Sequence, residues 1–145
     1  MYNEGFKFIL NPIEFNKTTE KGILQYCLGA TLYMPGTKDI IDKILEKKIN
    51  EFTSMVMCFE DAIPKEDLEK AETNVLFHLD KIAEAFDKGE LSLNDIPLIF
   101  LRVRNLAQFE SFLSKLTERQ AKALSGFVFP KFHSKNAGYY LHYLD

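Results

Sequence analysis

The chain has 145 residues, of which 46% are hydrophobic and 27% charged, a composition typical of a folded domain with a sizeable core. Its net charge of -3 argues against a protein that grips nucleic-acid phosphates, and no apolar run approaches the ~20 residues of a membrane span. Because the start lacks the layout of a secretion signal, we expect a cytoplasmic protein with no nucleic-acid or membrane partner. Cys27 and Cys58 lie far apart in or beside apolar runs, which favours buried free thiols.

The first part of the chain has no regular pattern. Pro12 and the polar stretch 16–20 indicate a leader, residues 1–27, that lies on the body of the protein. Residues 28–145 are regular and are expected to form one domain.

Short apolar runs alternate with helical patterns from Leu28 onward. Each run is apolar at consecutive positions, which indicates a strand buried on both faces. Strands that alternate with helices predict a parallel α/β sheet with right-handed crossovers. In chain order we expect a strand at 31–34, a helix at 40–49, a strand at 54–59, a helix at 64–86, a strand at 97–103, a helix at 105–116 capped by Asn105, a helical turn with the capping box Thr117–Gln120, a strand at 126–129 and a helix-like pattern within 133–145.

Charged residues follow the predicted strands directly. In parallel α/β folds, ligands bind at the carboxyl ends of the strands, so these positions are the candidate site. The candidates are Pro35 and Gly36 after the first strand, Glu60 and Asp61 after the second, Arg102 at the end of the third, and Lys131 after the fourth.

Arg102 lies between Leu101 and Val103, inside an apolar run. A guanidinium keeps its charge, so its burial requires an anionic partner, and Glu60 on the neighbouring strand is the natural candidate. Arg102 and Glu60 are therefore candidate catalytic residues, with Arg102 presenting its fork to a substrate carboxylate or carbonyl. The alternative is a structural ion pair at the end of the sheet.

The other candidates have similar alternatives. Glu60 and Asp61 are adjacent, so within a strand at most one would point into the site. Asp61 could help to hold a divalent metal through water, or both acids could simply precede a helix start at Pro64. Lys131 could steady an oxyanion or phosphate, or could be a solvated lysine. His78, beside the apolar stripe of a helix, is expected to have a surface or packing role.

Four short motifs stand at the ends of the predicted strands. They are Tyr33-Met34-Pro35-Gly36, Cys58-Phe59-Glu60-Asp61-Ala62-Ile63, Arg102-Val103-Arg104 and Phe129-Pro130-Lys131. In this order they resemble the motifs of the citrate lyase β-chain family, within the HpcH/HpaI aldolase superfamily. The resemblance covers about residues 28–132, and the sequence looks closest to a divergent bacterial branch of C–C bond lyases.

The resemblance implies a TIM barrel that uses Mg²⁺ and breaks or forms a carbon–carbon bond next to a carbonyl, in an oxo-acid or acyl-CoA substrate. It implies that Arg102 is the substrate-binding arginine, supported by Glu60, with Pro35, Gly36 and Lys131 at the same site. Two positions depart from the family pattern: Gly29 stands where an arginine is usual, and Cys58 replaces an acid. The main metal-ligand carboxylates of the family come from later strands, beyond residue 145.

Four strands make about half of a (β/α)₈ barrel. We therefore expect the N-terminal half of such a barrel, either a fragment of a longer chain or a subunit whose open side is covered by a homo-oligomer or by the remainder of the barrel. Alone, it is expected to be inactive. A non-catalytic ligand-binding or stress-resistance subunit that retains the fold is the alternative function, and a flavodoxin-like open sheet is the alternative fold.

Overall fold

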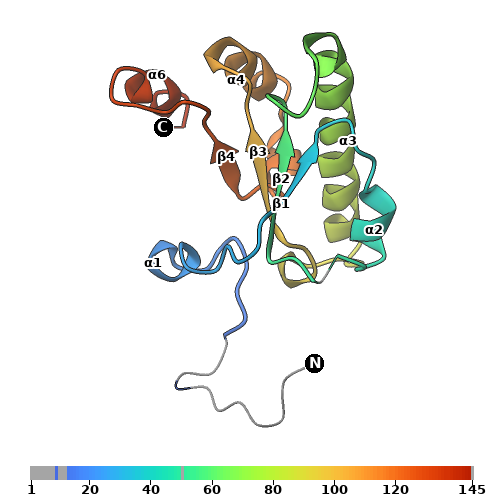
Figure 1. Ribbon diagram of the computed structural model, residues 1–145. Coiled ribbons are helices and arrows are strands. Elements are labelled where there is room, and N and C mark those ends of the chain that lie inside the picture. The colour runs from blue at the N-terminus through green and yellow to red at the C-terminus, as the bar shows by residue number, and fades with distance from the viewer. Residues whose placement is uncertain (1–8, 10–12, 50, 145) are drawn as a thin grey trace.

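The computed structural model describes residues 9, 13–49 and 51–144, and the arrangement of its elements is shown in Figure 1. Strands and helices alternate along the chain, as the sequence predicts. The strands are β1 (Leu32–Pro35), β2 (Ser54–Cys58), β3 (Leu98–Arg102) and β4 (Gly126–Val128). The helices are α1 (Lys21–Leu24), α2 (Ile41–Leu45), α3 (Leu68–Asp87), α4 (Leu106–Leu113), α5 (Glu118–Ala121) and α6 (Ala137–Leu141), with short 3₁₀ turns at Lys65–Asp67 and Leu93–Asp95.

The four strands form one sheet in the order β1-β2-β3-β4, and every neighbouring pair is parallel. Each strand is followed in the chain by at least one helix, so the connections are the βαβ crossovers that a parallel sheet requires. The predicted fold class, an α/β arrangement with the topology of part of a TIM barrel, is confirmed.

Helices α2, α3 and α4 pack on one face of the sheet, and the main core lies between them and the strands, whereas α1 and α6 lie to the other side (Figure 1). From the sheet, Met55, Met57, Ile99 and Leu101 enter this core, where they meet α2, α3 and Phe112 of α4. A smaller aromatic cluster joins α4 to α6, and in it the ring centroids of Phe109 and Tyr140 are 6.0 Å apart.

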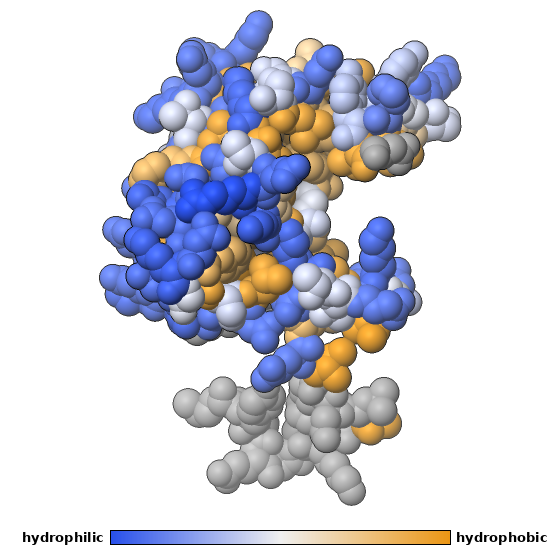
Figure 2. Space-filling view, turned by 180° about the vertical axis from the view of Figure 1, so that it is seen from behind, coloured by the Kyte–Doolittle hydropathy of each residue, from blue (hydrophilic) through white to orange (hydrophobic). Residues whose placement is uncertain are grey.

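The alternate positions of the strands point to the opposite face, which in a barrel would be the interior. Tyr33 on β1 is exposed there, and Phe100 on β3 is half-buried. In the space-filling view a hollow opens between the upper and lower parts of the molecule, with hydrophobic surface along its upper wall (Figure 2).

Capping residues set several helix ends as predicted. The Asn105 side chain accepts a hydrogen bond from the Gln108 amide at the start of α4, and Thr117 forms a capping box with Gln120 at α5. The helix predicted at 40–49 is shorter, because α2 ends at Leu45 and Lys47 turns into the left-handed region with φ of 57°.

The described part of the predicted leader lies against the amino-terminal side of the sheet. The Lys17 ammonium donates to the carbonyl oxygens of Ala121, Lys122 and Leu124 at 2.9, 2.9 and 2.7 Å. These carbonyls are at the end of α5 and just before β4, so the contact fastens the leader below the strands. Residues 1–8 and 10–12 of that prediction lie outside the described residues.

The cysteine prediction is only partly correct. Cys58 is buried and free, as expected, but Cys27 is only half-buried. Cys27 follows the small helix α1 rather than entering the core, and its thiol donates to the Ile23 carbonyl oxygen at 3.4 Å.

Candidate functional site

Two of the candidate residues, Pro35 and Arg102, lie in one row at the carboxyl ends of the strands. In the sheet register, Pro35 pairs with Cys58 and Cys58 pairs with Arg102. Residues paired in this way on parallel strands point to the same face. Pro35, Cys58 and Arg102 therefore lie on the face of the sheet opposite the main core, where Cys58 is buried and Pro35 and Arg102 are half-buried.

Arg102 meets two carboxylates at this end of the sheet. Its Nη2 atom forms an ion pair with Glu60 Oε2 and lies 3.2 Å from Asp61 Oδ2, to which it also donates a hydrogen bond. The expectation that at most one acid would face the site is wrong, because β2 ends at Cys58 and the chain then turns. Outside the strand, the alternation of side chains no longer applies.

Glu60 and Arg102 are both largely removed from water, so each charge needs the other as its counter-ion. The Glu60 side chain is 9% exposed and that of Arg102 28%, whereas Asp61 is 77% exposed. Burial of the guanidinium opposes its charge, but the attraction of Glu60 outweighs this, and the pKa of Arg102 is raised above its usual value. The arginine is therefore a permanent cation held by a buried carboxylate.

One edge of the Arg102 guanidinium remains open. Both carboxylates contact Nη2, and within the described residues no hydrogen bond engages Nε or Nη1. An arginine fork binds a carboxylate best through two parallel donors. Arg102 thus keeps donors available on the face of the sheet opposite the main core.

Lys131 adds a second positive charge. Its Nζ atom lies 3.8 Å from Glu60 Oε1, and its side chain is 87% exposed. The backbone of Lys131 is left-handed, with φ of 49°, which is uncommon for a residue other than glycine. Its carbonyl oxygen accepts a hydrogen bond from the Asn136 side chain, so the turn after β4 is held in place.

Arg104 holds the loop after β2, a role that was not predicted from the sequence. Its Nη1 atom donates to the carbonyl oxygens of Phe59 and Ile63 at 3.1 and 3.3 Å, which fixes the loop that carries Glu60. The Arg104 amide is bound in turn by the Gln108 side chain at 2.9 Å. Its spacing of two residues from Arg102 is the only sequence signal for this role.

The charges at the strand ends leave a surplus of one positive charge. Arg102, Arg104 and Lys131 supply three cations against two carboxylates from Glu60 and Asp61. The chain as a whole carries a net charge of -3. Counted over these five side chains alone, the charge is +1, opposite in sign to that of the whole chain.

Pro35 and Gly36 form the turn after β1. The Gly36 amide donates to the Cys58 carbonyl oxygen at 2.9 Å, which extends the sheet by one hydrogen bond. A Cβ at Gly36 would lie 3.0 Å from the Phe59 ring and 3.2 Å from Ala71. The glycine thus allows the turn to pack directly against the loop of Glu60.

A magnesium site is not complete in the described residues. Between residues 13 and 144, apart from residue 50, no group of three or more His, Cys, Asp or Glu side chains converges. Within the described ranges, the acids that contact Arg102 are Glu60 and Asp61. Mg²⁺ prefers six oxygen ligands with several waters, so these side chains alone do not fit such a centre.

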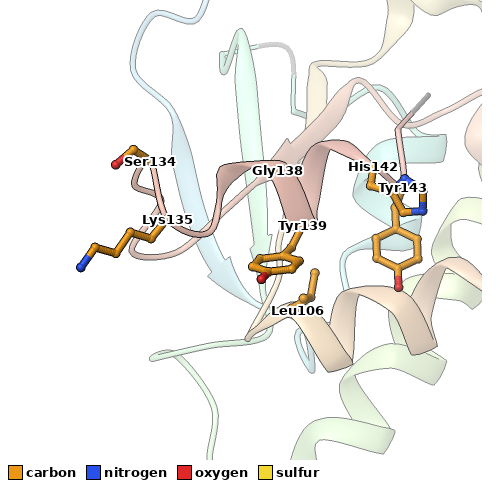
Figure 3. Close-up of a pocket in the computed structure, with 7 residues that line it drawn as sticks. All are labelled: Leu106, Ser134, Lys135, Gly138, Tyr139, His142 and Tyr143. Carbon is orange, nitrogen blue, oxygen red and sulfur yellow. The ribbon is translucent and has the colours of Figure 1, made fainter.

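Another hollow lies away from these residues, between α6 and the start of α4 (Figure 3). Tyr139 and Leu106 form its apolar wall, and Lys135 and His142 lie at its edges. None of the residues predicted for the site lines this hollow.

In the part of the chain that the structure describes, no helix has the length and apolar character to cross a membrane. Four parallel strands in sequential order, with α2, α3 and α4 packed on one face, are the arrangement expected for part of a TIM barrel. Residues 22–145 match the C–C bond lyase family of the TIM-barrel fold, and the chain belongs to this family. No curated protein matches the sequence.

Proposed function

We propose that this chain supplies part of a carbon–carbon lyase site for a small oxo-acid or acyl-CoA substrate, as in the citrate lyase β-chain and HpcH/HpaI enzymes that its motifs resemble. Membership of the C–C bond lyase family supports the class of reaction. The observation that carries the proposal is Arg102: a partly buried guanidinium, anchored by Glu60 on one nitrogen, with donors free on the face of the sheet opposite the main core.

The residues fit the electronic demands of this reaction. In an aldol-type cleavage, the hydroxyl on the departing carbon loses its proton and becomes a carbonyl. The electron pair of the broken carbon–carbon bond forms an enolate on the other fragment, which is then protonated. Fixed positive charges that face the enolate oxygen or a neighbouring carboxylate lower the barrier. Arg102 would bind the carboxylate or carbonyl, Lys131 would steady the oxyanion, and Glu60 would hold Arg102 in its orientation.

Mg²⁺ is proposed as the cofactor from the resemblance to these enzymes. When bound, it would polarise the substrate carbonyl as a Lewis acid. Asp61, the more exposed acid, could contact such an ion through water, and the remaining ligands would come from outside the described residues.

The partners proposed for the chain follow from the open sides of the sheet. A TIM barrel has eight strands, whereas β1 and β4 are each paired on one side only in the described sheet. We propose that further strands, from the remainder of the barrel or from a second copy, pair with these edges and cover the face opposite the main core.

Calorimetric titration tests the proposed site. Oxaloacetate, pyruvate and acetyl-CoA would be added, with and without Mg²⁺, to the wild type and to Arg102→Ala. We expect one oxo-acid or acyl-CoA to bind the wild type, and its affinity to fall about tenfold or more in Arg102→Ala, since a charge-assisted pair is lost.

Arg119→Ala is the matched control, because Arg119 pairs with Asp80 and Asp87 at a distance from the site. It removes the same charge and should leave binding unchanged. Equal binding by Arg102→Ala and the wild type would refute the proposal.

A further inference from the structure

Two side chains of α3, one helical turn apart, hold the loop that follows β1. Asn74 Nδ2 donates to the carbonyl oxygens of Gly36 and Lys38 at 2.8 and 3.1 Å. His78 Nε2 lies 3.0 Å from Asp39 Oδ1. Residues 36–39 are thus bound from one face of a long helix, because residues four apart on a helix are neighbours.

The Asp39 carboxylate connects this contact to the next helix. Its Oδ1 atom also accepts a hydrogen bond from the Ile41 amide, at the start of α2, at 3.2 Å. A hydrogen bond to an otherwise unpaired amide at a helix start stabilises that end. His78 therefore fixes both the loop and the first turn of α2.

His78 is an unusual residue for this position. Its side chain is fully buried, whereas that of its partner Asp39 is 76% exposed. Its other ring nitrogen, Nδ1, is buried and has no hydrogen-bond partner in the described part of the chain. For the contact with Asp39 to be a hydrogen bond, Nε2 must carry the proton, because a carboxylate oxygen only accepts.

The loop held in this way lies beside the proposed site. Gly36 is bonded to the Cys58 carbonyl oxygen, and Cys58 is the register partner of Arg102. On its other side, Gly36 packs against Phe59 and Ala71. A shift of residues 36–39 would therefore move the Pro35–Gly36 turn, which borders the strand ends where Arg102 lies.

We propose that Asn74 and His78 are positioning residues, which lock residues 36–39 so that the Pro35–Gly36 turn forms a fixed wall of the site around Arg102. Neither residue reaches the site, and they act through the loop alone. The hydrogen bonds that hold residues 36–39 are present without any ligand. Their effect on ligand binding rests on the proposed function.

Hydrogen exchange of the full chain measures, without any ligand, how firmly the hydrogen bonds of Asn74 and His78 hold residues 36–39. These hydrogen bonds are called the lock below. The first variants are Asn74→Leu, which keeps the shape but loses both donors, and Asp39→Ala, which removes the acceptor of His78 and of the Ile41 amide. Each should raise the exchange rate of the amides of residues 36–41 about threefold or more, since a net hydrogen bond is lost. The amides of β3 should be unaffected.

His78→Gln and His78→Leu form a matched pair. Glutamine can place an amide donor where Nε2 lies, so it should restore slow exchange, whereas leucine should not. The same variants are then titrated with oxaloacetate and Mg²⁺, and the loss of affinity should follow the loss of protection, with rescue by glutamine.

The outcomes separate the two claims. Unchanged exchange of residues 36–41 in Asp39→Ala and Asn74→Leu would overturn the lock. Faster exchange with unchanged affinity for oxaloacetate would overturn its positioning role. If the wild type itself fails to bind, the proposed function fails with the positioning role, while the exchange result still decides the lock.

Discussion

Arg102 and Glu60 meet at the carboxyl ends of two adjacent parallel strands, where a buried carboxylate and a partly buried guanidinium form an ion pair. The pair connects β3 to the loop after β2. Since Asp61 reaches the same nitrogen of Arg102, the two acids hold the arginine from one side and leave its other edge free.

Glu60→Gln should destabilise the protein, because it leaves Arg102 without its buried counter-ion. We expect the free energy of unfolding in urea to fall by about 2 kcal/mol, below the usual loss for a fully buried pair because Arg102 keeps some contact with water. Asp61→Asn, at the exposed acid, should change it by less than about 0.5 kcal/mol. Equal effects of the two variants would contradict this account.

Gly36→Ala tests the close packing of the turn after β1. The new methyl group would lie 3.0 Å from the Phe59 ring, so the ring or the turn must move. We expect a loss of about 1–3 kcal/mol in the free energy of unfolding. Gly138→Ala is the control, because a Cβ at this position in α6 meets nothing within 4 Å. That variant should be neutral or stabilising, and a similar loss in both would count against the packing assigned to Gly36.

Lys17→Met tests whether the leader is fastened to the body. The variant keeps the length of the side chain but loses three hydrogen bonds to carbonyl oxygens at the end of α5 and before β4. We expect a loss of about 1–2 kcal/mol in the free energy of unfolding and faster proteolysis of the leader. Lys21→Met, at an exposed position on α1, should have little effect on either measurement. Unaltered proteolysis in Lys17→Met would mean that the leader is held by other contacts.

The pH dependence of Asp39 reports on its contact with His78. The hydrogen bond from His78, and then that from the Ile41 amide, hold the pKa of this carboxyl below its usual value. A carboxylate with a lowered pKa stabilises the fold above the pKa of the unfolded chain, and this contribution is lost as pH falls through the folded pKa. Carboxyl NMR should therefore give Asp39 a lower midpoint in the wild type than in His78→Leu. A midpoint that is the same in both would show that His78 does not bind Asp39.

Much of the fold could be predicted because its signals are local. The consecutive apolar runs gave all four strands within one or two residues, and the caps at Asn105 and Thr117 marked two helix starts correctly. The length of α2 was overestimated because an apolar spacing does not show that Lys47 leaves the helical region. A left-handed residue other than glycine has no clear signal in the sequence.

The candidate site was predictable where it depends on sheet geometry. Arg102 inside an apolar run required an acid, and Glu60 supplies it from the loop just after Cys58, the register partner of Arg102. The contact between Asp61 and Arg102 was not predicted, because it depends on where β2 ends. The pairing of His78 with Asp39 joins residues 39 positions apart, and the rotation of α3 that brings them together follows from packing, which the sequence does not show.

The central claim is that the free edge of Arg102 binds a substrate anion, and arginine side-chain NMR tests it most directly. The chain has only three arginines, Arg102, Arg104 and Arg119, so their Nε–H signals can be resolved and assigned by substitution. On titration with oxaloacetate and Mg²⁺, we expect the Arg102 signal to shift in a saturable manner, while that of Arg119, bound to Asp87, stays in place. An Arg102 signal that does not move, or that moves no more than that of Arg119, would contradict the claim.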